Sequence, residues 1–173
     1  MKKLPLLAAF AALLLSLPAA AQDPALNDAQ IAHIAYTAGQ IDIAAAQQAI
    51  EKSKTKAVVE FAQEMARDHK AVNDQALALV KKLNVTPEDN ATSQALSKQA
   101  SAKLEELGAL DGKAFDTAYI ANEVAFHKTV DSALSDTLIP GAQNAELKAL
   151  LETGLKLFTE HEKHAEHVAA EIK

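Results

Sequence analysis

The chain has 173 residues, a formal net charge of -6 at pH 7, 4% aromatic residues and no cysteine. This length suffices for one domain with a buried core. Without cysteine, disulfides and a lipid-modified N-terminal cysteine are excluded, so any bound metal must use His, carboxylate or water ligands. The negative charge argues against nucleic acid or an anionic membrane surface as a partner.

The N-terminal stretch has the pattern of a secretory signal peptide over residues 1–21. Lys2 and Lys3 precede an apolar run from Leu6 to Leu17, and a small-residue cleavage site ends at Ala21. The run is shorter than the roughly 20 residues that a transmembrane helix needs, and no later segment comes close. We therefore expect a periplasmic or secreted protein in which residues 22–173 form a single domain without a transmembrane segment.

Apolar residues recur at helical spacing through the remaining sequence and predict four long helices and one shorter helix. The first helix follows an N-cap at Asn27 and ends near Glu51, and the second follows Ser53 or Thr55. A shorter, more polar helix is expected over about residues 92–107. A fourth helix then runs from 112 to about 137, and a last one follows Pro140 and Gly141.

This order predicts an all-α four-helix bundle. If residues 86–111 cross the length of the bundle, the helix that starts at 112 runs parallel to the second helix. Sixteen helical residues at about 1.5 Å each cover roughly 24 Å, which is nearly enough for that crossing. The topology is then up-down-down-up with a short crossover helix.

Five polar residues lie within the apolar arcs of the four long helices, where an unpaired charge would cost several kcal/mol. In the predicted topology they fall within about 9 Å of axial rise of one another. Two of them are spaced i,i+4, so both side chains can bind one ion. The pattern predicts a metal site with the ligands Asp42, His69, Glu123, His127 and His161.

Three further residues are expected around these ligands. Asp68 and Glu162 lie at the edges of their arcs and could orient an imidazole by accepting its free N–H. Tyr119 is interpreted as a core aromatic beside the site and not as a redox residue. The other C-terminal histidines, His164 and His167, also fit a solvated face.

Mixed imidazole and carboxylate ligands suit iron, manganese, zinc or copper, and the spacing does not choose among these transition metals. The alternative is a buried His-carboxylate network in which the same polar groups satisfy one another without a metal. Both interpretations stay open on the sequence alone.

The segments FAQEMARDH (61–69) and FDTAYI (115–120), followed by His127 and His161, resemble an exported bacterial family catalogued as domain of unknown function 4142. Its members are often labelled outer membrane proteins and are placed with ferritin-like bundles. The resemblance implies a periplasmic ferritin-like four-helix bundle. Ferritin-like di-iron proteins use Glu-x-x-His on two helices, whereas Glu123 and His127 are spaced i,i+4, which leaves a single-metal or degenerate site.

The leading hypothesis is a metal-binding bundle with a role in metal handling or envelope stress protection. The alternative is a metal-free helical interaction or envelope-stress protein, and a metal-dependent oxidoreductase comes third. No Ser-His-Asp order, Gly-rich phosphate loop or nucleophilic Cys supports hydrolysis or nucleotide chemistry. The sequence names no protein partner, and a homo-oligomer stays open.

Overall fold

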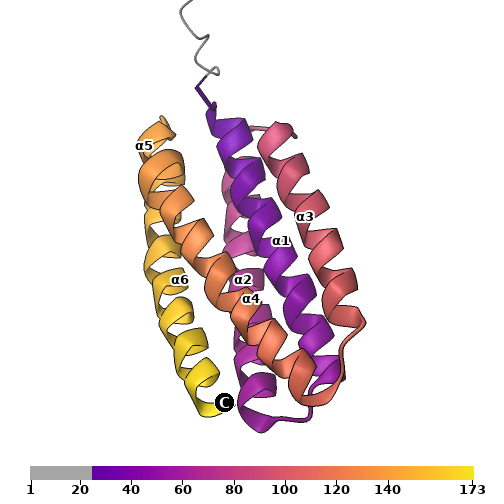
Figure 1. The fold of residues 1–173 in the computed structure, drawn as a ribbon. Helices are drawn as coiled ribbons and strands as arrows, with labels where there is room; N and C mark the ends of the chain where they lie inside the picture. The colour runs from indigo at the N-terminus through magenta and orange to yellow at the C-terminus, as the bar shows by residue number, and fades with distance from the viewer. Residues whose placement is uncertain (1–24) are drawn as a thin grey trace, which may run out of the picture.

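The structure is a computed structural model that describes residues 25–173, so the predicted signal peptide at 1–21 lies outside the described residues. Five long helices carry almost all of this part of the chain (Figure 1). In residues 25–173, no helix is both long enough and apolar enough to cross a membrane. The long helices are α1 (Asp28–Lys52), α2 (Lys56–Lys82), α3 (Ala91–Gly108), α4 (Gly112–Ala133) and α6 (Ala145–Glu171).

The predicted up-down-down-up topology is confirmed. In the view of Figure 1, α1 descends, α2 ascends, α3 descends along the outside of α1, α4 ascends and α6 descends. The crossover helix α3 has 18 residues, which lets it span the bundle and sets α4 parallel to α2. Consequently the ends of α1 and α6 share one end of the bundle with the starts of α2 and α4.

Side-chain caps define where several helices begin. Asn27 accepts a hydrogen bond from the Gln30 backbone N–H at 2.8 Å, and the Gln30 side chain accepts from the Asn27 N–H at 3.2 Å, a reciprocal capping box. Thr55 is the N-cap of α2, but its hydroxyl donates to Asp116 Oδ2 at 2.5 Å and makes no cap bond. The start of α2 is therefore tied to α4 across the bundle.

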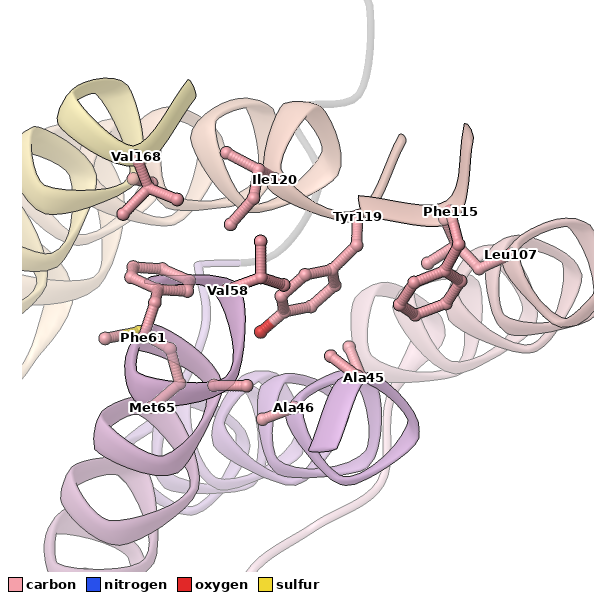
Figure 2. Close-up of a cluster of buried hydrophobic side chains, with 13 residues drawn as sticks. Ala45, Ala46, Val58, Phe61, Met65, Leu107, Phe115, Tyr119, Ile120 and Val168 are labelled. Carbon is pink, nitrogen blue, oxygen red and sulfur yellow. The ribbon is translucent and has the colours of Figure 1, made fainter. Parts of the chain in front are cut away.

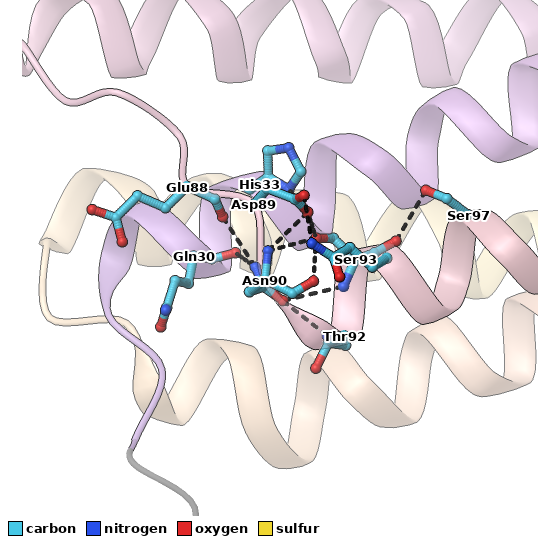
Figure 3. A network of polar contacts seen from close by, with 9 residues as sticks. Gln30, His33, Glu88, Asp89, Asn90, Thr92, Ser93 and Ser97 are labelled. Atoms are coloured by element: carbon cyan, nitrogen blue, oxygen red, sulfur yellow. Dashed lines mark hydrogen bonds and ion pairs between the residues drawn. The ribbon is translucent and has the colours of Figure 1, made fainter.

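The loop between α2 and α3 is held against the start of α1 by a polar network around Asn90 (Figure 3). The Asn90 side chain accepts from the N–H groups of Thr92 and Ser93, each at 3.1 Å, which begins α3. Its amide donates to the carbonyl of Gln30 on α1 at 3.4 Å. The cap thus places the first turn of the crossover helix beside α1.

The fourth helix was predicted as one continuous segment to about residue 137, and the structure modifies this end. Regular α-helix stops at Ala133, and a π-helical turn, η1 (Leu134–Leu138), leads into the short α5 (Ile139–Gly141). The wider turn keeps Leu134 and Leu138 both buried, at 3% and 5% exposed. The departure from the prediction therefore preserves the buried face of the segment.

Two clusters of apolar side chains fill the bundle. The aromatic core occupies the end where α1 meets α2, and Figure 2 shows Phe61, Tyr119 and Phe115 among its members. The aliphatic core, rich in leucine and isoleucine, occupies the opposite end, near the start of α1 and of α6. Between them lies a buried polar cluster made by side chains from the four bundle helices, Asp42, His69, Glu123, His127 and His161.

Candidate metal centre

The five residues predicted as metal ligands meet in the middle of the bundle. Each is only 1% or 2% exposed. Helices α1, α2 and α6 contribute one residue each, and α4 contributes two that are one turn apart. The sequence folds in this way because each polar residue lies in the apolar stripe of its helix, so burying the stripe also buries the polar residue.

Three imidazole rings form the centre of this cluster. The ring centroids of His69, His127 and His161 are 5.4 to 5.6 Å apart in every pairing. One nitrogen from each ring lies within 4.8 Å of the others, close enough to share one ion. Phe158 stacks on His69 at a centroid distance of 4.5 Å, nearly parallel at 7°, which restrains the tilt of that ring.

Two carboxyl groups border the imidazoles. Asp42 Oδ2 lies 3.5 Å from His69 Nε2 and 3.6 Å from His127 Nε2. Asp42, Glu123 and His127 form a second group whose ligand atoms lie within 4.8 Å of one another. His127 belongs to both groups, so the carboxyl pair and the imidazole trio are one continuous site.

Most ligand atoms of the cluster have no hydrogen-bond partner among residues 25–173. A buried polar atom left without a partner costs about 1–3 kcal/mol, so such a concentration calls for a specific explanation. A bound cation would satisfy one ligand atom from each residue of a group, either the three imidazoles or Asp42, Glu123 and His127. The unpartnered atoms are Oδ1 and Oδ2 of Asp42, Nδ1 and Nε2 of His69, Oε2 of Glu123, Nε2 of His127 and Nδ1 of His161.

Two of the imidazoles are oriented by hydrogen bonds that leave one nitrogen free. His127 Nδ1 donates to the backbone carbonyl of Glu123 at 3.0 Å, because a carbonyl can only accept, and Nε2 then carries the lone pair. His161 Nε2 lies 3.2 Å from Asp68 Oδ2, so its Nδ1 is the nitrogen left without a partner. This is the arrangement in which outer partners fix the tautomer of a metal-binding histidine.

Burial keeps the cluster close to neutral when no cation is present. It raises the pKa of Asp42 to about 7 and, together with the neighbouring Asp42, raises the pKa of Glu123 well above its usual value. Burial also lowers the pKa of His127 to about 4 and that of His69 well below its ordinary range. Neutral imidazoles are the form that binds a metal, and a cation would in turn favour ionised carboxylates.

The residues predicted to surround the ligands have different positions. Asp68 contacts His161 as described, whereas Glu162 is paired with Lys128 at 3.8 Å, on the side of α6 that faces α4. Tyr119 is fully buried and stacks on Phe115 at a centroid distance of 6.0 Å. Its hydroxyl has no partner among the described residues, and burial raises its pKa well above the usual value.

Sequence reasoning missed two parts of the site. The first is Phe158, which stacks on His69. The signal for it was present in the sequence, because Phe158 lies three residues before His161 and therefore on the same face of α6. An apolar cavity of about 310 Å³ adjoins His69 and His127 on the aliphatic side and is lined mainly by aliphatic side chains such as Val130 and Leu151. No local sequence pattern predicts such a cavity, because it depends on how neighbouring helices fail to interlock.

Comparisons with known proteins agree with this fold. A sequence model of the family described as domain of unknown function (DUF4142) matches residues 15–168. No curated protein sequence matches the chain. A crystal structure from Streptomyces coelicolor, described as a secreted protein DUF305, has a TM-score of 0.71 and 13% sequence identity, covering 84% of this chain and 93% of that one. At this identity the likeness concerns the fold alone.

Proposed function

We propose that this chain, which belongs to the DUF4142 family, binds a transition-metal ion at the polar cluster between its two cores. His69, His127 and His161 would supply nitrogen ligands, and Asp42 and Glu123 would supply oxygen ligands. The observation that carries the proposal is the convergence of unpartnered ligand atoms from all four bundle helices. A buried metal-free cluster of this kind leaves several polar atoms unsatisfied, and a bound cation would relieve part of that penalty.

The ligand types suit iron, manganese, zinc or copper, since imidazole and carboxylate groups both bind ions of this kind. The protein holds the metal away from water, because every ligand residue is at most 2% exposed. Such burial favours retention over rapid exchange. We therefore propose a role in metal handling or envelope stress protection, in an exported protein whose residues 22–173 form the mature domain.

The protein residues would position the ion in defined ways. The Glu123 carbonyl and the Asp68 carboxylate hold the rings of His127 and His161, and Phe158 restrains the ring of His69. A bound transition metal would supply Lewis-acid or redox chemistry. The apolar cavity beside His69 and His127 is the place where a small uncharged molecule would approach, which keeps a metal-dependent oxidoreductase as the third hypothesis.

Elemental analysis of untagged protein purified from the periplasm tests the proposal. We expect about one metal ion per chain in the wild type, because the three imidazoles can share one ion. The double variant His69→Gln, His127→Gln should lose this metal. The matched control is His33→Gln, which removes a histidine outside the polar cluster and should keep the metal.

The second candidate is the metal-free interaction protein, and the spacing of Asp42 from two imidazoles favours it. At 3.5 and 3.6 Å, a small relaxation would turn these approaches into hydrogen bonds. In that case the wild type, the double variant and the His33→Gln control would carry the same substoichiometric metal. That result would overturn the metal proposal and leave the histidines with a structural role.

A further inference from the structure

The contact between α2 and α6 carries a row of carboxylate and imidazole side chains that begins at His161 of the central cluster and extends beyond it. We call it the α2–α6 row. The two helices are antiparallel, so positions four apart on α2 face positions three apart on α6 (Figure 1). Its members are Glu60, Glu64 and Asp68 on α2 and His161, His164 and His167 on α6.

Ion pairs join the two sides of the row at successive turns. His161 Nε2 lies 3.2 Å from Asp68 Oδ2, and His164 Nδ1 lies 2.8 Å from Glu64 Oε2. One turn further on, Glu60, Glu64, His164 and His167 line a surface pocket of about 320 Å³. Carboxylate therefore contacts imidazole at two successive turns, and the same residue types line the pocket at the surface end.

The exposure of these side chains changes stepwise along the row. The side chains of His164 and Glu64 are 39% and 33% exposed, that of Asp68 is 19% exposed, and that of His161 is 2% exposed. The row thus leads from solvent to the buried cluster, with carboxylate and imidazole groups at each step.

His161 belongs to both metal-binding groups. Its ligand atoms fall in the group with His69 and His127 and in a separate group with Glu64 and Asp68, each within 4.8 Å. Nε2 faces Asp68, whereas Nδ1 has no partner, so the two nitrogens can serve the two groups separately. A single ring can then contact an ion on either side of it.

The other opening toward the cluster is unsuited to an ion. The cavity beside His69 and His127 is lined almost entirely by apolar side chains such as Val130 and Leu151. A hydrated divalent cation that crossed it would lose water ligands without gaining protein ligands, which is prohibitively costly. The α2–α6 row replaces water with carboxylate and imidazole at each step.

We infer that Glu64, Asp68 and His161 form an outer transit site that loads a divalent transition-metal ion into the buried cluster, an inference that rests on the proposed metal-binding function. The site is suited to transit because its charge is partly neutralised. Arg67, whose side chain is 68% exposed, contacts Asp68 at 2.7 Å and competes with the ion for that carboxylate. An ion is therefore held less tightly here than among the buried ligands.

The rate of zinc loading tests this inference. Metal-free protein is mixed with Zn²⁺ alone, and aliquots are challenged with EDTA at increasing times before the protected zinc is counted by elemental analysis. In Glu64→Gln we expect loading about tenfold slower than in the wild type, the size of effect typical when a residue just outside a metal site is changed. The final amount of protected zinc should be unchanged.

The matched control is Glu105→Gln, which makes the same charge change at an exposed position of α3, away from the row. His164→Gln is a second test variant and should also slow loading. Equal rates in the wild type, Glu64→Gln and His164→Gln would overturn the inference, as would equal slowing in the control. Absence of protected zinc from the wild type would instead overturn the proposed metal site itself.

Discussion

The aromatic core and the aliphatic core are packed to different degrees. In the aromatic core the large side chains Phe61, Tyr119, Phe115 and Ile120 are all 0% exposed. In the aliphatic core most large side chains keep 3% to 9% exposure, and a cavity of about 310 Å³ remains among them. The same four helices thus form a close-packed end and a loosely packed end.

Side-chain shape explains the difference. The aromatic core combines flat rings with alanines, and Phe61 and Tyr119 meet edge to face at 6.2 Å, so rings fill the space that small residues leave. The cavity at the aliphatic end is lined by two helical glycines, Gly39 and Gly154, and by residues of the π-helical turn. The polar cluster lies at the boundary, with a rigid support on one side and an adaptable one on the other.

The largest effect that can test this contrast is truncation of matched isoleucines. Ile120→Ala in the aromatic core should lower the free energy of unfolding by about 4 kcal/mol, near the upper end of the range for such truncations. Ile34→Ala, in the wall of the cavity, should cost about 2 kcal/mol because its contacts are fewer. Urea denaturation of the two variants measures both values.

The contrast would fail if the two isoleucine variants lost the same free energy. A changed dependence on urea concentration would indicate loss of two-state unfolding and would make the comparison unsuitable. The conservative variants Ile120→Val and Ile34→Val provide the control. Each should lower the free energy of unfolding by about 0.5–1.5 kcal/mol, with the larger loss again at Ile120.

Metal binding should stabilise the polar cluster that lies at the boundary between the two cores. A metal at a hundred times its dissociation constant adds about 2.7 kcal/mol to the unfolding free energy. For a domain of this size that corresponds to a melting temperature higher by about 5–10 °C. Calorimetry with and without a chelator measures the shift, which should vanish in His127→Gln and persist in His33→Gln. An unchanged melting temperature in the wild type would favour the metal-free network.

The pH dependence of the metal-free protein reports on the same boundary. Asp42 has its pKa raised to about 7 in the folded state, so its contribution to stability is lost as pH rises from about 4 through 7. His127 has its pKa lowered from 6.5 to about 4, so its contribution is lost as pH falls through that window. The two trends oppose each other below pH 6.5, and above it the imidazole trend fades while the carboxyl trend continues.

We therefore expect titration of Asp42 to lower the unfolding free energy of the metal-free wild type by less than about 1 kcal/mol between pH 6.5 and 7.5, since one pKa unit corresponds to 1.36 kcal/mol and the carboxyl group is on average half protonated there. Asp42→Asn should reduce this loss because the amide does not titrate. Denaturation at closely spaced pH values measures it. Stability that rises with pH in this interval would contradict protonated carboxyl groups in the folded cluster.

Much of this architecture follows from the sequence because the helical period is strong. The cap at Asn27, the length of the crossover segment and the apolar arcs predict the helix order, and the arcs also contain the five central polar residues. The roles of these residues as ligands stay predictions. Asp68 and Glu162 looked equivalent at arc edges, yet one contacts His161 and the other Lys128. Angular position on a helix does not say which neighbour lies beyond the edge.

The cavity and the π-helical turn could not be predicted, because both depend on packing between helices that are distant in sequence. Glu64 was missed for the same reason. Its position four residues before Asp68 is visible in the sequence, but its contact with His164 requires the antiparallel register of α2 and α6. The sequence thus predicts which residues face inward, and the assembled bundle decides how those residues combine.

The smallest test of the packing contrast uses the two buried helical glycines that line the cavity. A Cβ added at Gly154 would meet Phe158 at 3.4 Å, an ordinary contact, whereas one added at Gly39 would clash with the buried side chain of Asn73. Because alanine favours helix over glycine by about 0.8–1.0 kcal/mol, Gly154→Ala should raise the unfolding free energy by about 0.5–1 kcal/mol. Gly39→Ala, its matched control, should lower it, since Asn73 would lose its bond to the Tyr36 carbonyl. Thermal denaturation of both variants measures the signs, and destabilisation by Gly154→Ala would mean that the aliphatic core has no room there for one methyl group.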